Sequence, residues 1–151
     1  MRGTGAHHSS MAMLPFSQIF FYLAMQFMPV GTQQFTIAAG TEPKITFTRQ
    51  ADDTWTGTSG NNPHSIIFSA KDSVVTVAAG EGQKRDIDVS TFVNVATDAD
   101  KKKTVTLGGK PITVTVNPDA TTVTFLVKEN GGTAEKPVVI TFFAKAQDAG
   151  H

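Results

Sequence analysis

Two pairs of carboxylates have a spacing that could serve chemistry. Asp86 and Asp88 lie two residues apart, so a strand would place both on one face, and Asp98 and Asp100 repeat this spacing. Such pairs can bind calcium or act as a general acid and base. Cationic residues adjoin each pair, however, and neither pair matches the spacing of a helix-loop-helix calcium site. The favoured interpretation is therefore solvated loop charges, and we predict no metal ligands here.

The histidines and the sequence motifs do not identify a catalytic group either. His64 and His151 have no accompanying Ser or Asp motif, and the adjacent His7 and His8 lack the further ligands of a metal site. The chain contains no Cys, which excludes thiol nucleophiles, disulfides and Cys-ligated metals. The Gly-x-Ser-x-Gly, Walker A, His-Glu-x-x-His and dinucleotide-binding motifs are absent. We therefore predict no catalytic residues, no cofactor and no enzymatic activity.

The charge pattern argues against nucleic acid as a partner. The 151 residues carry 13 Lys and Arg against 13 Asp and Glu, which leaves no domain-wide positive field for a phosphate backbone. Lys101, Lys102 and Lys103 form one local cluster that could meet a phosphate or an acidic polymer, but Asp98 and Asp100 precede it. No aromatic residue interrupts the cluster for base stacking, so a solvated turn is favoured.

From residue 35 onward, apolar residues alternate with Thr or Ser in short runs, which is typical of β-strands rather than of helices. Clusters of Gly, Pro, Asn and Asp separate these runs and predict turns. The predicted strands are 34–38, 44–49, 54–58, 64–70, 73–78, 86–95, 103–107, 111–116, 121–127 and 137–144.

This pattern predicts an all-β fold. Short, regularly punctuated strands favour an antiparallel β-sandwich of about 8–10 strands, immunoglobulin-like or related, with a small barrel as the alternative. The stretch 104–125, in which Gly108-Gly109-Lys110-Pro111 enters an alternating strand, resembles bacterial extracellular immunoglobulin-like or transthyretin-like sandwich modules. The resemblance implies the same sandwich but covers too little of the chain to assign a family.

Side-chain parity gives each strand a buried face, because residues two apart point the same way. Val123, Phe125 and Val127 should therefore point inward, opposite their neighbouring threonines. The runs 74–77 and 138–143 are apolar on both faces, which predicts central strands or a covered surface.

Four aromatic residues are candidates for lining a ligand cavity: Trp55, Phe47, Phe68 and Phe125. They would do so if the strands closed into a small barrel that carries an apolar ligand. Trp55 also has a simpler interpretation, in which it fills the core at the end of a strand.

A second candidate site is an interaction surface. Val139, Thr141 and Phe143 alternate along the run 138–143, so they share one face, which could contact another subunit. Threonines also alternate in several other strands. Flat Thr-x-Thr arrays resemble those of ice-binding proteins, but the uneven strand spacing favours Thr simply as a strand former that tolerates solvent.

The N-terminal part of the chain is built differently. No Asp, Glu, Lys or Arg occurs between Arg2 and Glu42, and the run 19–25 is entirely apolar, which is typical of a signal peptide. One alternative is that residues 14–30 form an uncharged core helix or strand of the domain, and another is a retained membrane anchor. The predicted division is a signal peptide or leader over 1–31, a single all-β domain over 32–148 and a tail over 149–151.

Together these observations predict an exported, non-enzymatic β module with a structural or protein-binding role, secreted, periplasmic or at the cell surface. Its expected partner is another protein or a cell-surface component, and no permanent membrane span is expected beyond the leader. The alternatives are the small barrel with an apolar ligand, and an enzyme using Asp86 and Asp88 or His64. Three observations would separate these hypotheses. Exposure of the run 138–143 would favour the protein-binding module, a ligand-sized lumen would favour the barrel, and titratable groups that converge in one cleft would favour the enzyme.

Overall fold

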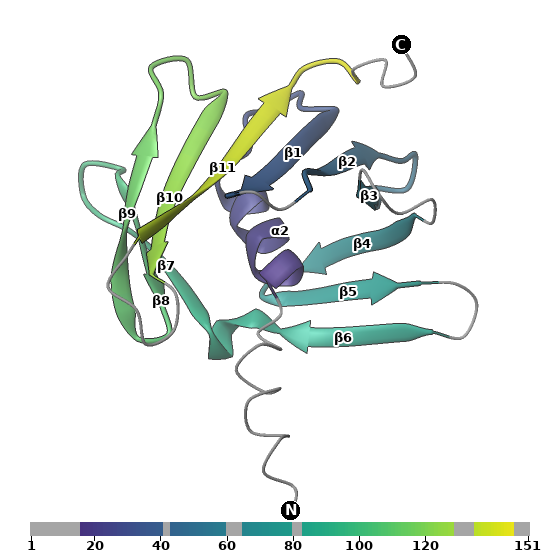
Figure 1. Cartoon of the computed structure of the whole chain (residues 1–151), viewed down its shortest axis with the longest axis horizontal. Coiled ribbons are helices and arrows are strands. Elements are labelled where there is room, and N and C mark those ends of the chain that lie inside the picture. Colours follow the sequence, from purple (N-terminus) through teal and green to yellow (C-terminus); the bar gives the residue numbers. More distant parts are fainter. Residues whose placement is uncertain (1–15, 41–42, 60–64, 80–82, 129–134, 147–151) are drawn as a thin grey trace, which may run out of the picture.

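The computed structural model describes residues 16–40, 43–59, 65–79, 83–128 and 135–146. Within these ranges the chain forms one α-helix, a short 3-10 helix and a sheet of 11 strands (Figure 1). The elements are α2 (Phe16–Phe27), β1 (Gln34–Ala39), β2 (Ile45–Arg49), β3 (Trp55–Ser59), β4 (Ile66–Lys71), β5 (Val74–Ala78), β6 (Lys84–Asp88), η1 (Val89–Thr91), β7 (Val93–Thr97), β8 (Lys103–Leu107), β9 (Lys110–Val116), β10 (Thr122–Lys128) and β11 (Glu135–Phe143).

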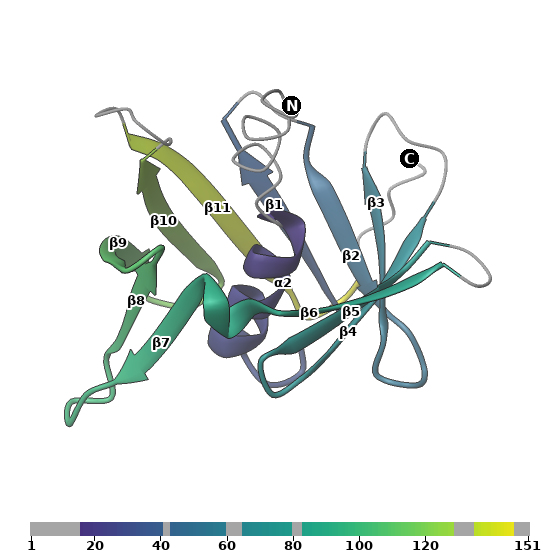
Figure 2. The same cartoon turned by 90° about the horizontal axis from the view of Figure 1, so that it is seen from below.

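All the strands belong to one sheet, in the order β6-β5-β4-β3-β2-β1-β11-β10-β9-β8-β7. Every neighbouring pair is antiparallel, and the first and last strands of the chain pair with each other, with Ile37 opposite Ile140. Figures 1 and 2 show this sheet curling around helix α2. The predicted all-β, antiparallel fold is therefore confirmed, but the strands form a single open sheet instead of the two facing sheets of a sandwich.

Helix α2 fills the inside of the curved sheet. Its segment carries no charged residue, and a helix that is apolar around most of its circumference is stable when it is buried. It ends before Pro29, because proline disfavours helical backbone at the residue that precedes it. The helix supplies the apolar layer that a second sheet supplies in a sandwich. Its buried side chains, each at most 2 % exposed, are Ile19, Phe20, Phe21, Leu23 and Ala24.

This placement bears on the N-terminal predictions. Helix α2 packs its buried residues 19–21, 23 and 24 into the core, as the core-helix alternative for residues 14–30 predicts. Removal of residues 1–31 would take α2 out of that core, whereas cleavage itself stays a prediction of the sequence. Residues 1–15 lie outside the described part of the chain. In the part that the structure describes, no helix combines the length and hydropathy needed to cross a membrane.

The inner face of the sheet forms the rest of the core, with the parity that the sequence predicts. Val123 and Phe125 of β10 are fully buried, and Val127 packs against the core from the end of the strand. The run 138–143 lies in β11, which is one of the central strands, as expected. The run 74–77 lies in β5, which pairs with β4 and β6 and is only one strand from the edge of the sheet. Helices α2 and η1 contact this strand, so it matches the covered-surface alternative.

The run 86–95, predicted as one strand, is broken into two. Strand β6 ends at Asp88, the 3-10 helix η1 follows, and β7 begins at Val93. The carboxylate of Asp88 causes the break, because its Oδ1 accepts hydrogen bonds from Ser90 N at 3.0 Å and from Ser90 Oγ at 2.6 Å and so caps η1. The break raises the strand count above the predicted range and creates the two open edges of the sheet, β6 and β7.

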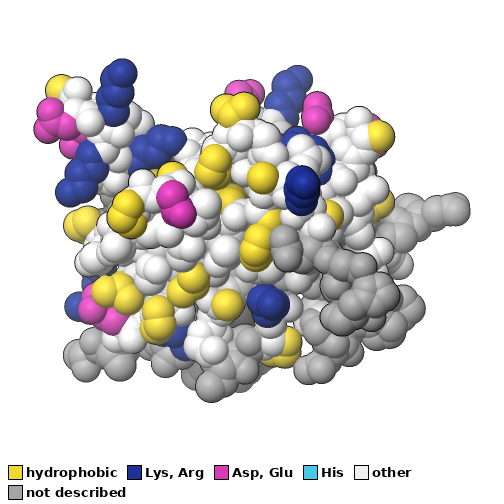
Figure 3. All heavy atoms as spheres, turned by 90° about the horizontal axis from the view of Figure 1, so that it is seen from above, with side chains coloured by type: hydrophobic (Ala, Val, Ile, Leu, Met, Phe, Trp, Pro, Cys, Tyr) yellow, Lys and Arg dark blue, Asp and Glu magenta, His cyan; other side chains and the backbone are white. Residues whose placement is uncertain are grey.

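Most hydrophobic side chains on the outer surface are isolated from one another. On the face shown in Figure 3 they are scattered among polar side chains and backbone. The large hydrophobic residues that are exposed in the described ranges are Phe16, Val30, Ile67 and Val116. Scattered exposed hydrophobic residues are normal and do not by themselves mark a binding site.

Candidate contact surface

The four aromatic candidates for a ligand cavity lie inside the sheet. Phe47 and Phe125 are fully buried, and Trp55 and Phe68 are only 2 % and 4 % exposed. The ring centroid of Phe21, on helix α2, lies 5.5 Å from that of Phe47 and 5.2 Å from that of Phe68. The helix thus occupies the space where the barrel alternative places a ligand. Trp55 has the core-filling role that the sequence also suggested.

The other end of this interior is packed in the same way. Phe20 and Phe27 place their rings edge-on to Phe125, at centroid distances of 5.6 Å and 5.5 Å. A Cβ atom at Gly57 would lie only 3.0–3.1 Å from two neighbouring phenylalanine rings, so glycine allows these rings to close over β3. The interior is therefore a packed aromatic core.

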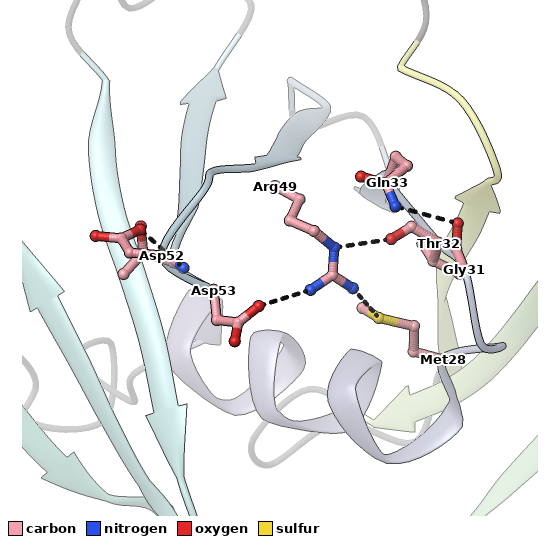
Figure 4. Close-up of polar contacts among 8 residues, drawn as sticks. Met28, Gly31, Thr32, Gln33, Arg49, Asp52 and Asp53 are labelled. Atoms are coloured by element: carbon pink, nitrogen blue, oxygen red, sulfur yellow. Dashed lines mark hydrogen bonds and ion pairs between the residues drawn. The ribbon is translucent and has the colours of Figure 1, made fainter.

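Arg49 ties the loop after α2 to the β2–β3 hairpin (Figure 4). Its Nε donates a hydrogen bond to Thr32 O at 3.0 Å, and its Nη2 lies 3.6 Å from Met28 Sδ. Its Nη1 lies 3.5 Å from Asp53 Oδ1, and its guanidinium carbon lies 4.5 Å from the centroid of the Trp55 ring. Each partner is part of the framework, so the role of Arg49 is to hold the segment that leads from the core helix into β1.

Replacement of this guanidinium should destabilise the fold. We expect Arg49→Lys to lower the free energy of unfolding by about 1–2 kcal/mol, because the ammonium cannot keep the hydrogen bond to Thr32 while it stacks on Trp55. Asp53→Asn is the matched control, since the carboxylate of Asp53 is exposed and asparagine tolerates its positive φ of 64°. Urea unfolding measures both variants, and an equal loss for the two would contradict the assigned role.

The carboxylates considered in the sequence serve separate turns and strands. Asp86 Oδ1 accepts a hydrogen bond from Thr76 Oγ1 at 2.8 Å, across the β5–β6 pair. Asp98 Oδ1 accepts the backbone N–H groups of Asp100 at 2.9 Å and Lys102 at 2.8 Å, which closes the β7–β8 turn. These carboxylates therefore do not converge in one cleft.

Among the residues that the structure describes, no three His, Asp or Glu side chains gather closely enough to hold a metal ion. The histidines His7, His8, His64 and His151 all lie outside the described residues.

Hydrogen bonds lower the pKa of Asp88. Its carboxylate accepts from Ser90 Oγ at 2.6 Å, from Ser73 Oγ at 2.9 Å and from Ser90 N at 3.0 Å, and these bonds favour the ionised form. Threonine hydroxyls lower the pKa of Asp52 and Asp119 in the same way. All three carboxylates are exposed, so the lowered pKa values reflect local capping rather than a catalytic cleft.

The cap on η1 should make stability sensitive to acid. The pKa of Asp88 in the folded chain lies below its ordinary value of 3.8. The ionised carboxylate therefore stabilises the folded chain fully at a pH above 3.8, and this stabilisation is lost as the pH falls through the pKa of the folded chain. We expect the urea midpoint of the wild type to fall between about pH 5 and pH 2, and that of Asp88→Asn to fall less steeply. Asp100→Asn, which removes an exposed carboxylate but no cap, is the control, and identical pH profiles for Asp88→Asn and the wild type would refute the expectation.

Five threonines align across the outside of the sheet. Thr58 pairs with Thr46, Thr46 with Thr36, Thr36 with Thr141, and Thr141 with Thr122, so the row crosses β3, β2, β1, β11 and β10. Neighbouring strands are spaced by about 4.8 Å, which gives the row a length of about 19 Å.

Two further rows flank the first on the same face. One row runs through Thr56, Thr48, Gln34 and Phe143, and the other through Ala38, Val139, Thr124 and Thr115. We call these three rows together the threonine face. The threonine face covers the middle of the sheet, and none of its residues is charged. Such a surface can be covered by another uncharged protein surface without burying an unpaired charge.

The candidate interaction residues lie in the threonine face. Val139, Thr141 and Phe143 of β11 are half-buried and alternate with the buried residues of the inner face. Gln34, next to Phe143 in its row, is 4 % exposed, and its Nε2 donates to Thr48 Oγ1 at 3.0 Å. The structure thus brings the three together with residues from five other strands, which the sequence did not identify as part of the same surface.

No protein-family model, curated protein or solved structure matches this chain.

Proposed function

We propose that this chain is a non-enzymatic structural or protein-binding module, and that the threonine face is its contact surface. The observation that carries the proposal is the alignment of uncharged side chains across five central strands. The centres of protein interfaces are depleted of charged residues, since a charge buried there without a partner is costly. The partner that suits this face is an uncharged protein surface with hydroxyl and aliphatic groups.

A charge placed in this face tests the proposal. Cells that naturally produce the chain are lysed under mild conditions, and the extract is separated by size. We expect the wild-type chain in a complex larger than a single chain. Thr141→Lys, at the centre of the first row, should release the chain from that complex. Thr104→Lys is the matched control, because Thr104 is exposed on β8, three strands away from β11, and belongs to none of the three rows.

Two further measurements keep this experiment decisive. Unfolding curves of both purified variants establish that they fold, and hydroxyl-radical labelling of Val139 and Phe143 should be weaker in the complex than in the isolated chain. A wild-type chain that migrates alone in the extract would overturn the proposal. So would a Thr141→Lys chain that stays in the complex with its labelling unchanged.

Export is the second part of the proposal, and it is supported by the uncharged, apolar N-terminal segment. The test is the N-terminal sequence and intact mass of the chain in the exported, membrane and cytoplasmic fractions of its producer. A chain in the exported pool supports the proposed location, and a chain confined to the cytoplasm contradicts it. A start near Thr32 would favour the leader, and a start before Phe16 would favour α2 as a permanent part of the module.

A further inference from the structure

A surface pocket of about 410 Å³ lies where helix α2 ends, beside strands β8 and β9. Val116 of β9 pairs with the fully buried Val123 of β10, so Val116 and Val114 belong to the inner face of the sheet. The pocket is therefore a part of the inner face that the helix does not cover. Its lining residues are Phe27, Lys101, Lys102, Lys103, Val114 and Val116.

Lys103 is held in place by the end of the helix. Its Nζ donates a hydrogen bond to Gln26 O, and the same atom lies 5.3 Å from the centroid of the Phe27 ring. An ammonium group in this position complements the negative end of the helix dipole and satisfies a carbonyl that the last turn leaves free. Lys103 thus fixes Phe27 as one wall of the pocket.

Lys101 and Lys102 leave their charges available. Both are exposed, and no ion pair joins either ammonium group to a carboxylate of the described residues. Asp98 is already engaged by the backbone N–H of Lys102 at 2.8 Å, and this bond shapes the turn that presents the two lysines. In Figure 3, several Lys and Arg side chains, with acidic side chains beside them, lie on the side of the molecule that carries β7 to β9, and others lie elsewhere on the same face.

We propose that this pocket binds a small amphipathic anion, namely a carboxylate on an aliphatic body. Val114, Phe27 and Val116, which is 45 % exposed, offer an apolar wall whose burial is favourable by about 25 cal/mol per Å². Lys101 and Lys102 offer ammonium donors to the carboxylate, and such charge-assisted hydrogen bonds are stronger than neutral ones. The volume lies within the range of small-molecule sites, which is about 300–1,000 Å³.

The probe for this site is octanoate, titrated into the full-length chain while the methyl and amide resonances are followed by NMR. We expect saturable shifts at Val114 and Val116, and weaker ones with acetate, which lacks the chain, and with 1-octanol, which lacks the charge. The double variant Lys101→Gln/Lys102→Gln should weaken octanoate binding about tenfold. Lys84→Gln/Arg85→Gln, which removes two exposed charges from β6, is the matched control and should bind as the wild type does.

Several outcomes would overturn this site. Absent shifts at the two valines, equal binding of octanol and octanoate, or an equal loss in the two double variants would each do so. Vesicles of phosphatidylglycerol form a separate arm, since a lipid headgroup could present the same anionic chemistry. Binding to the vesicles without binding to monomeric octanoate would replace the small molecule by a membrane surface and contradict the proposal.

Discussion

A chain that begins at Thr32 is expected to lose its cooperative unfolding transition. This truncation removes helix α2, and with it the side chains of Ile19, Phe20, Phe21 and Leu23, which are each at most 2 % exposed. Burial of one such side chain stabilises a fold by about 1.5–3 kcal/mol, and the whole free energy of unfolding of a domain is about 5–15 kcal/mol. The four losses together are therefore comparable with the entire stability of the domain.

The truncated chain would also expose the inner face of its sheet. Phe35, Phe47, Phe68 and Phe125 would face water, and exposed apolar surface of this extent promotes association. We therefore expect dye binding and aggregation in place of a sharp transition in calorimetry and urea unfolding.

A chain that begins at Phe16 is the matched control, because it keeps the whole helix. It should unfold cooperatively, with a midpoint close to that of the full-length chain. If the chain from Thr32 unfolds with the same midpoint as the chain from Phe16, then α2 does not stabilise the domain. The leader prediction for residues 1–31 would then gain its strongest support.

The strands were predictable because the chemistry that forms them is local. Alternation in 121–127 is enough to place Val123 and Phe125 on one face, and the same parity holds in the structure. Helix α2 was not predictable in this way. An apolar segment without charge has the same composition in a signal peptide as in a core helix, so composition does not separate the two.

The threonine face was predictable only one strand at a time. Parity places Val139, Thr141 and Phe143 on a common face of one strand, but their neighbours depend on strand order and register. The first row joins Thr36 to Thr141, which are far apart in the sequence. The contact between Lys103 and Gln26 likewise joins residues 77 positions apart. The local sequence pattern therefore predicts only that Lys103 belongs to a charged turn.

Phe21→Ala is expected to lower the free energy of unfolding by about 3–5 kcal/mol, the range found for deletion of a buried phenylalanine ring. The ring of Phe21 is fully buried and lies 6.0 Å, 5.5 Å and 5.2 Å from the rings of Phe35, Phe47 and Phe68, measured between centroids. These three rings belong to three different strands, so the cavity cannot close unless the sheet itself shifts. Urea unfolding measures the loss, and Phe16→Ala on the same helix, where the ring is 38 % exposed, should cost less than about 1 kcal/mol.

The same variant also tests what the helix does for the interior. A dry cavity lined by aromatic rings can bind benzene, and a ligand that binds only the folded state raises the unfolding temperature. Benzene should therefore raise the unfolding temperature of Phe21→Ala and leave that of the wild type unchanged. This result would mean that the rings around Phe21 keep their places when its ring is removed, and that the ring of Phe21 fills this part of the core in the wild type. A rise of equal size in both proteins would instead mean that the interior of the wild type already holds an open cavity, and that the helix does not fill it.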